Sequence, residues 1–167
     1  ICNLVLVICY FRFIRVRCNR IGNTMIRIGP AGSNGLGNLK GVSKVAEMDL
    51  DCMEIEFTYG VRMDLETAKD VGALAKEKGI ILSVHAPYYI NLASDEAEKF
   101  AASKKRILDA CERARAMGAQ NVTFHAGFYQ KKTADQTYIL IKEAILEIQN
   151  VIKKRKWQVQ LCPEITG

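Results

Sequence analysis

The stretch "LSVHAPYYINLAS", residues 82–94, places a histidine where a short apolar run meets a proline, two tyrosines and an asparagine. The stretch "NVTFHAGFY", residues 121–129, repeats this arrangement with the second of the chain's two histidines. A short apolar and β-branched run that is bounded by turn-forming residues is typical of a buried strand. The two stretches therefore predict two strands that end at His85 and His125.

From Met25 onward, short apolar runs of this kind alternate with amphipathic helical patterns. Strict alternation of strands and helices predicts a parallel sheet with right-handed crossovers. The predicted strands cover residues 25–29, 52–58, 80–85, 121–125 and 158–164. The predicted helices cover residues 38–49, 64–79 and 94–117, and a fourth begins at a capping box formed by Thr133 and Gln136.

Two architectures fit this order, a doubly wound sheet and a (β/α)8 barrel. The glycine-rich stretch "GSNGLG", residues 32–37, lacks the spacing and the acidic partner of a dinucleotide-binding loop, so it predicts only a loop and a helix entry. A complete barrel takes about 250 residues. We therefore predict an α/β fold that is a partial (β/α)8 TIM barrel with about five β/α units.

Composition is ordinary for a globular protein. The chain has 167 residues, of which 49% are hydrophobic and 25% are charged, enough for one domain. The net charge of +6 includes four arginines and no acid within residues 1–24, so the remainder is only mildly basic. Charge alone therefore does not establish a nucleic-acid partner.

Residues 1–24 differ from the rest in being apolar, acid-free and without an initial Met. We predict that they are a leader outside the family domain, upstream of a true start at Met25, with a truncated membrane anchor as the less favoured alternative. Residues 25–167 would then form the amino-terminal part of one barrel domain. The six cysteines include no CxxC pair, which favours a reducing cytoplasm.

The residues with the most distinctive chemistry fall at one end of the predicted barrel. His85 ends the third strand, His125 the fourth and Glu164 the fifth, at intervals of 40 and 39 residues. Active sites of (β/α)8 barrels lie at the carboxyl ends of the strands. Imidazole and carboxylate groups are the ligands of catalytic zinc, whereas a single buried histidine is more often a hydrogen-bonded core residue. Three such groups on successive strands predict a metal site.

Four stretches of the sequence also resemble a known family. "HAPYYINLAS", "FHAGFY" and "PEITG" resemble the third-, fourth- and fifth-strand motifs of the endonuclease IV family, the zinc-dependent abasic-site endonucleases, and "MIRIGPAGS" resembles its first strand. The resemblance covers Met25 to Gly167. The His-Ala-Gly motif and the strand-five glutamate are shared more widely with barrels of the sugar-isomerase type.

The resemblance implies that His85 and His125 bind one zinc ion and that Glu164, as a catalytic residue, bridges it to a second. It implies a cluster of zinc ions that hydrolyses the phosphodiester 5′ to an abasic site in base-excision repair. The later strands would supply the other ligands, so we expect this fragment by itself to be inactive.

The resemblance also implies DNA contacts and a partner. Tyr88 and Tyr89 match the loop that enters the DNA at the lesion, and Arg62 matches an inserted arginine. The expected partner is double-stranded DNA with abasic sites, with no membrane partner and a cytoplasmic location.

Two other hypotheses stay open: a metal-dependent sugar-phosphate isomerase or epimerase on the same barrel, and a non-catalytic binding module. Exposed tyrosines would favour DNA, and a pocket with polar contacts would favour a sugar. Glu54 and Glu56 share one face of the strand at 52–58, where they are either structural or close to the site.

Overall fold

A four-stranded parallel sheet lies at the centre of the molecule. The structure is a computed structural model that describes residues 5–7, 20–21, 24–25 and 27–165, the first three segments as backbone only. The strands lie side by side in chain order: β5 Cys52–Glu56, β6 Ile81–His85, β7 Asn121–His125 and β8 Gln160–Glu164. The helices between them are α1 Asn38–Glu47, α2 Leu65–Lys78, α3 Ala97–Met117 and α4 Ala134–Lys154.

Strand β4, Arg27–Gly29, lies along the free edge of β5. The backbone N–H of Asp51 donates to the carbonyl of Ile28 at 2.9 Å, and that of Glu54 donates to the carbonyl of Pro30 at 3.0 Å. The approach is so close that a Cβ on Gly29 would lie 1.7 Å from the carbonyl oxygen of Cys52, a position that only glycine tolerates. Five parallel segments, β4 to β8, therefore follow one another across the sheet.

The residues that the structure describes within the predicted strand 25–29 all lie in strands. Met25 belongs to β3, Thr24–Met25, which pairs antiparallel with β2, Arg20–Ile21, whereas β4 begins at Arg27. The other edge of β4 pairs in parallel with β1, Val5–Val7, within the predicted leader. The prediction that residues 1–24 are a leader falls largely outside the described residues and stays a prediction.

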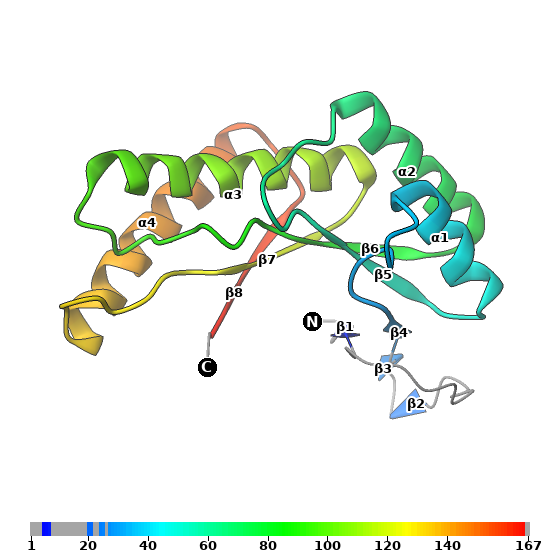
Figure 1. Cartoon of the computed structure of the whole chain (residues 1–167), viewed down its shortest axis with the longest axis horizontal. Helices are drawn as coiled ribbons and strands as arrows, with labels where there is room; N and C mark the ends of the chain where they lie inside the picture. The colour runs from blue at the N-terminus through cyan, green and yellow to red at the C-terminus, as the bar shows by residue number, and fades with distance from the viewer. Residues whose placement is uncertain (1–4, 8–19, 22–23, 26, 166–167) are drawn as a thin grey trace.

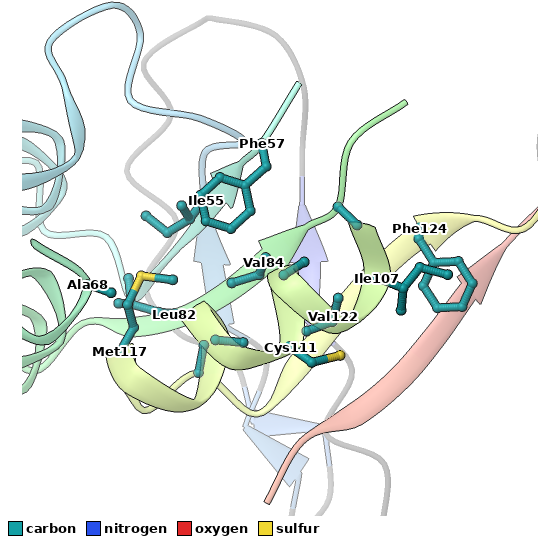
Figure 2. Close-up of a cluster of buried hydrophobic side chains, with 14 of the residues drawn as sticks. Ile55, Phe57, Ala68, Leu82, Val84, Ile107, Cys111, Met117, Val122 and Phe124 are labelled. Carbon is teal, nitrogen blue, oxygen red and sulfur yellow. The ribbon is translucent and has the colours of Figure 1, made fainter. Parts of the chain in front are cut away.

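All four helices lie on one side of the sheet (Figure 1). Alternate residues of each strand point toward them, and Figure 2 shows these side chains packed between the strands and α2 and α3. Burying apolar surface in this layer is the main favourable contribution to folding. The strand residues in this core include Ile55, Leu82, Val84, Val122 and Phe124.

The opposite face of the same strands is polar, because side chains alternate between the two faces of a strand. No described helix covers this face (Figure 1). We call it the polar face. Its polar residues are Glu54 and Glu56 from β5, Ser83 and His85 from β6, Asn121, Thr123 and His125 from β7, and Gln160 and Glu164 from β8. Three less polar residues share this face: Cys52, Ile81 and Cys162.

Helix ends follow the sequence closely. Asp64 caps α2 by accepting from the backbone N–H of Thr67, Gly79 ends that helix in the left-handed conformation, and Thr133 with Gln136 forms the predicted capping box of α4. Helix α1 ends at Glu47, two residues earlier than predicted.

The helical spacing of apolar residues within 94–117 predicts a buried face of Ala97, Phe100, Ala101, Ile107, Leu108, Cys111 and Ala114, and α3 confirms it only in part. The helix begins at Ala97 rather than at residue 94, and both Ala97 and Ala101 are exposed. The buried face is Ser103, Ile107, Ala110, Cys111, Ala114 and Met117. Within the described part of the chain, no helix has the length and apolar character needed to cross a membrane.

Candidate metal centre

Three adjacent strands bring the predicted ligands together. His85, His125 and Glu164 end β6, β7 and β8, and one donor atom from each lies within 4.8 Å of the others. The carboxylate Oε2 of Glu164 lies 3.5 Å from Nε2 of His85 and 3.9 Å from Nδ1 of His125. The structure therefore brings the three side chains together, and their role as metal ligands stays a prediction.

A hydrogen bond orients the first histidine. Nδ1 of His85 lies 2.8 Å from the backbone carbonyl of Ala86. A carbonyl oxygen only accepts, so Nδ1 carries the proton, and in the neutral ring Nε2 keeps its lone pair. Because that Nε2 is the atom nearest Glu164, His85 presents a free ligand nitrogen to the centre of the triad.

The second histidine supplies a test of whether a metal fits. Nδ1 of His125 is buried and has no hydrogen-bond partner among the described residues, although buried polar nitrogens nearly always have one. Two nitrogens and a carboxylate oxygen converging on one point match the donors that a divalent zinc ion takes. The residues present therefore fit a divalent metal ion, with His85 Nε2, His125 Nδ1 and Glu164 Oε2 as its ligands.

Aromatic rings border this centre. The ring of Tyr88 stacks on that of His125, with centroids 5.6 Å apart and planes at 18°, and its centroid is also 5.6 Å from that of His85. Tyr88 remains 52% exposed and Tyr89 is 64% exposed. Arg106 donates a hydrogen bond to the backbone carbonyl of Tyr89 at 3.0 Å and so ties this loop to α3.

Phe128 and Tyr129 were missed by the sequence reasoning. They are 58% and 60% exposed and follow His125 by three and four residues, as Tyr88 and Tyr89 follow His85. The signal was present, because both loops have the pattern His-Ala-x-aromatic-Tyr. Two successive strand ends therefore each carry one candidate ligand and one exposed aromatic pair.

Arg62 is not joined to this group. It is exposed on the segment between β5 and α2, and within the described ranges no side-chain hydrogen bond, ion pair or ring contact links it to the triad or to the tyrosines. Arg113 of α3 holds the end of this segment by donating from Nε to the carbonyl of Met63 at 2.7 Å. The DNA-binding role of Arg62 stays a prediction.

The two carboxylates of β5 differ in environment. Glu54 is buried on the polar face, and this burial raises its pKa; the nearby carboxylates of Glu56 and Glu164 raise it further, while His85 and a hydrogen bond from Ser83 lower it. Glu56 is exposed. Both alternatives left by the sequence therefore hold in part, since Glu54 is buried within the sheet and is also electrostatically linked to the triad.

Comparison with known proteins identifies the fold family. Residues 42–167 match the sequence profile of the xylose isomerase-like TIM barrel family. The chain belongs to this family. An uncharacterised protein from Methanocaldococcus jannaschii is 35% identical over 145 residues, covering 86% of the chain and 52% of that protein. The chain thus spans about half the length of this relative.

Solved structures agree on the fold. A D-psicose 3-epimerase structure determined in the presence of D-fructose aligns with a TM-score of 0.66 at 19% identity, over 80% of this chain and 48% of that one. Endonuclease IV from Thermus thermophilus aligns with a TM-score of 0.58 at 19% identity, over 78% and 48%. The predicted partial (β/α)8 barrel is confirmed. The specific resemblance to endonuclease IV is not confirmed, because most of the similar structures are sugar epimerases.

Proposed function

We propose that this chain contributes to the active site of a divalent-metal-dependent enzyme. The observation that carries the proposal is the convergence of His85, His125 and Glu164 at the carboxyl ends of three adjacent strands. A zinc ion bound there would neutralise substrate charge and lower the pKa of a coordinated water. The protein groups hold the ion, and the Ala86 carbonyl keeps the His85 ring in its ligating orientation.

Two reactions are compatible with such a centre. The first is hydrolysis of the DNA phosphodiester 5′ to an abasic site, in base-excision repair. The aromatic residues support it, because the ring of Tyr88 stacks on His125. Three further exposed rings lie on the two loops that follow His85 and His125: Tyr89, Phe128 and Tyr129. Exposed rings can stack on bases and hold a duplex open while a nucleotide is turned out of it. Double-stranded DNA carrying abasic sites is the partner that this reaction requires.

The second reaction is metal-dependent isomerisation or epimerisation of a sugar or sugar phosphate. The comparisons support it better than the first, because several similar structures are sugar epimerases and one is an endonuclease IV. These similarities lie at 20% identity or below and establish the fold rather than the reaction. The polar face also favours a hydroxyl-rich substrate. The rim geometry and the comparisons thus point to different substrates.

The experiment tests the metal site before the reaction. Zinc binding to the 167-residue chain is measured by competition with a chromophoric chelator, for the wild type and His125→Ala. We expect one tightly bound zinc ion in the wild type and at least about a hundred-fold weaker binding in the variant. Loss of a residue that only hydrogen-bonds to a metal ligand lowers metal affinity about 10–100-fold, and loss of a ligand itself should cost more. Wild-type binding no tighter than that of His125→Ala would overturn the proposal.

The reaction is then tested with a chain extended to the length of its relatives. The metal-loaded protein is incubated with a duplex that contains one abasic site, and separately with D-fructose, each with and without chelator. Chelator-sensitive nicking 5′ to the site that is lost in Tyr88→Ala would establish the endonuclease. Chelator-sensitive conversion of D-fructose would establish the epimerase. A zinc-loaded, folded protein that does neither would refute both reactions.

A further inference from the structure

A cavity lies at the carboxyl ends of β4 and β5, on the side of the sheet next to the candidate metal centre. Its volume is about 330 Å³, and the glycine-rich loop after β4 forms one wall, while the end of β5 forms the other. Its polar side chains are Ser33, Asn34, Asn38, Glu56 and Thr58. We call it the loop pocket. Neither the metal ligands nor the aromatic rim belongs to it.

The loop pocket adjoins the strand end that carries His85, one of the candidate metal ligands. Glu56 pairs in register with His85 on the neighbouring strand, and both side chains project from the polar face. The backbone N–H of Tyr88 donates to the carbonyl of Thr58 at 3.3 Å, so the wall of the pocket is tied to the loop that covers the triad. A molecule in the pocket would therefore lie next to the strand end that carries His85.

The position of Glu56 depends on a glycine. A Cβ on Gly32 would lie 2.7 Å from Oε2 of Glu56, so the absence of a side chain leaves room for the carboxylate. Gly32 also has a φ of +72°, which favours glycine independently. Among the described residues, Glu56 forms no side-chain hydrogen bond or ion pair. The carboxylate is thus placed in the pocket with its acceptor capacity unused.

The chemistry of the lining selects a class of ligand. One carboxylate, two amides and two hydroxyls offer donors and acceptors at short spacing, which matches vicinal hydroxyl groups. The lining contains no lysine or arginine, and Glu56 opposes an anion, so phosphate is disfavoured. It contains no aromatic or large aliphatic side chain for a base or an apolar group.

We infer that the loop pocket binds the hydroxyl groups of a sugar, with the Glu56 carboxylate as the main acceptor, and presents the sugar to the metal centre. The inference rests on the proposed function and specifies its substrate contact. The sugar has two sources, a free ketose or the deoxyribose of an abasic site, and the experiment separates them.

Binding is measured on the isotope-labelled 167-residue chain by amide chemical shifts in the presence of chelator, so that neither metal nor turnover is needed. The probes are D-fructose, a duplex with one abasic site, and inorganic phosphate. We expect saturable shifts at Gly32, Gly35 and Thr58 with D-fructose or with the abasic duplex, and none with phosphate. The probe that produces the shifts identifies the source of the sugar.

Variants test the role of the carboxylate. Glu56→Gln is expected to weaken binding at least about ten-fold, the loss for one hydrogen bond to a charged group. Gly32→Ala is expected to have a similar effect, because its methyl group occupies the place of the carboxylate. Gly79→Ala is the matched control: Gly79 has the same φ of +72° and open space around it, so it imposes the same backbone strain without touching the pocket.

The inference would be overturned by the absence of saturable shifts with both sugar probes, by equal shifts with phosphate, or by unchanged affinity in both pocket variants. Its failure is separable from that of the proposed function. Tight zinc binding without chemical-shift changes at the pocket residues would refute this inference and leave the proposed function standing. Chemical-shift changes at the pocket residues in a chain that binds no zinc would refute the metal-dependent function and still support sugar binding in the pocket.

Discussion

Replacing Gly72 by alanine separates helix propensity from tertiary packing. Gly72 lies in the interior of α2, where alanine is favoured over glycine by about 1 kcal/mol, so local propensity predicts a more stable variant. In the structure, however, a Cβ on Gly72 would lie 2.4 Å from the carbonyl oxygen and 2.7 Å from the carbonyl carbon of Met117, near the end of α3. The obstacle is backbone, which cannot rotate away.

The magnitude follows from these distances. Ordinary contact begins near 3.4 Å, so α2 and α3 must separate by about 1 Å at this point. Overpacking of this kind costs about 1–3 kcal/mol, and the propensity gain offsets only part of it. We expect Gly72→Ala to lower the free energy of unfolding by about 1 kcal/mol, and to shift the strands beneath the two helices.

Gly41→Ala is the matched comparison, since it adds the same methyl group inside α1. There the nearest atoms are Cβ of Ser33 at 2.8 Å and Cε of Met53 at 2.9 Å, one in a surface loop and one at the end of a flexible side chain. Urea unfolding followed by far-UV circular dichroism measures both variants, and Gly41→Ala is expected to be the more stable. A Gly72→Ala variant as stable as the wild type would refute the reasoning.

Three further predictions concern the site and the core. Zinc at saturating concentration should raise the unfolding temperature of the wild type and leave that of His125→Ala unchanged, because binding to the folded state alone stabilises it; equal rises would contradict the ligand assignment. Burial raises the pKa of Glu54 above its ordinary value, so the folded state binds the proton more tightly than the unfolded state. The free energy of unfolding should therefore fall as the pH rises from about 4.5 through the raised pKa. Urea unfolding at a series of pH values should show this fall in the wild type and a smaller one in Glu54→Gln. Burial also raises the pKa of Cys111 to about 12, so its thiol stays protonated and unreactive at pH 8. Maleimide at that pH should label the more accessible Cys162 and should label Cys111 only after urea unfolds the chain. Peptide mass spectrometry would identify the labelled cysteines.

Strand and helix positions were largely predictable because they depend on local periodicity and capping. Thr133 and Asp64 act through neighbours three residues away, so their roles are visible in the sequence. The boundaries that failed depend on distant contacts. Ala97 and Ala101 of α3 fit the spacing of a buried helix face, but nothing in the local pattern shows that both stay exposed in the fold.

The metal triad was predictable for a different reason. Parallel strands that alternate with helices bring all their carboxyl ends to one edge, so strand-end residues about 40 positions apart must converge. The side-chain details were not predictable. The stacking of Tyr88 on His125 depends on how two loops fold over the sheet, and the accessibility of the Glu56 carboxylate depends on Gly32, 24 positions earlier.

By itself, the sequence determined the α/β class, the order of its units and the three residues that converge at one edge, because periodicity and topology are properties of the chain. Only the tertiary structure decided which polar atoms lack partners, which aromatic rings stay exposed and where the loop pocket forms. Those features depend on distances of a few ångströms between segments that no local pattern relates. They are also the features that distinguish one barrel enzyme from another.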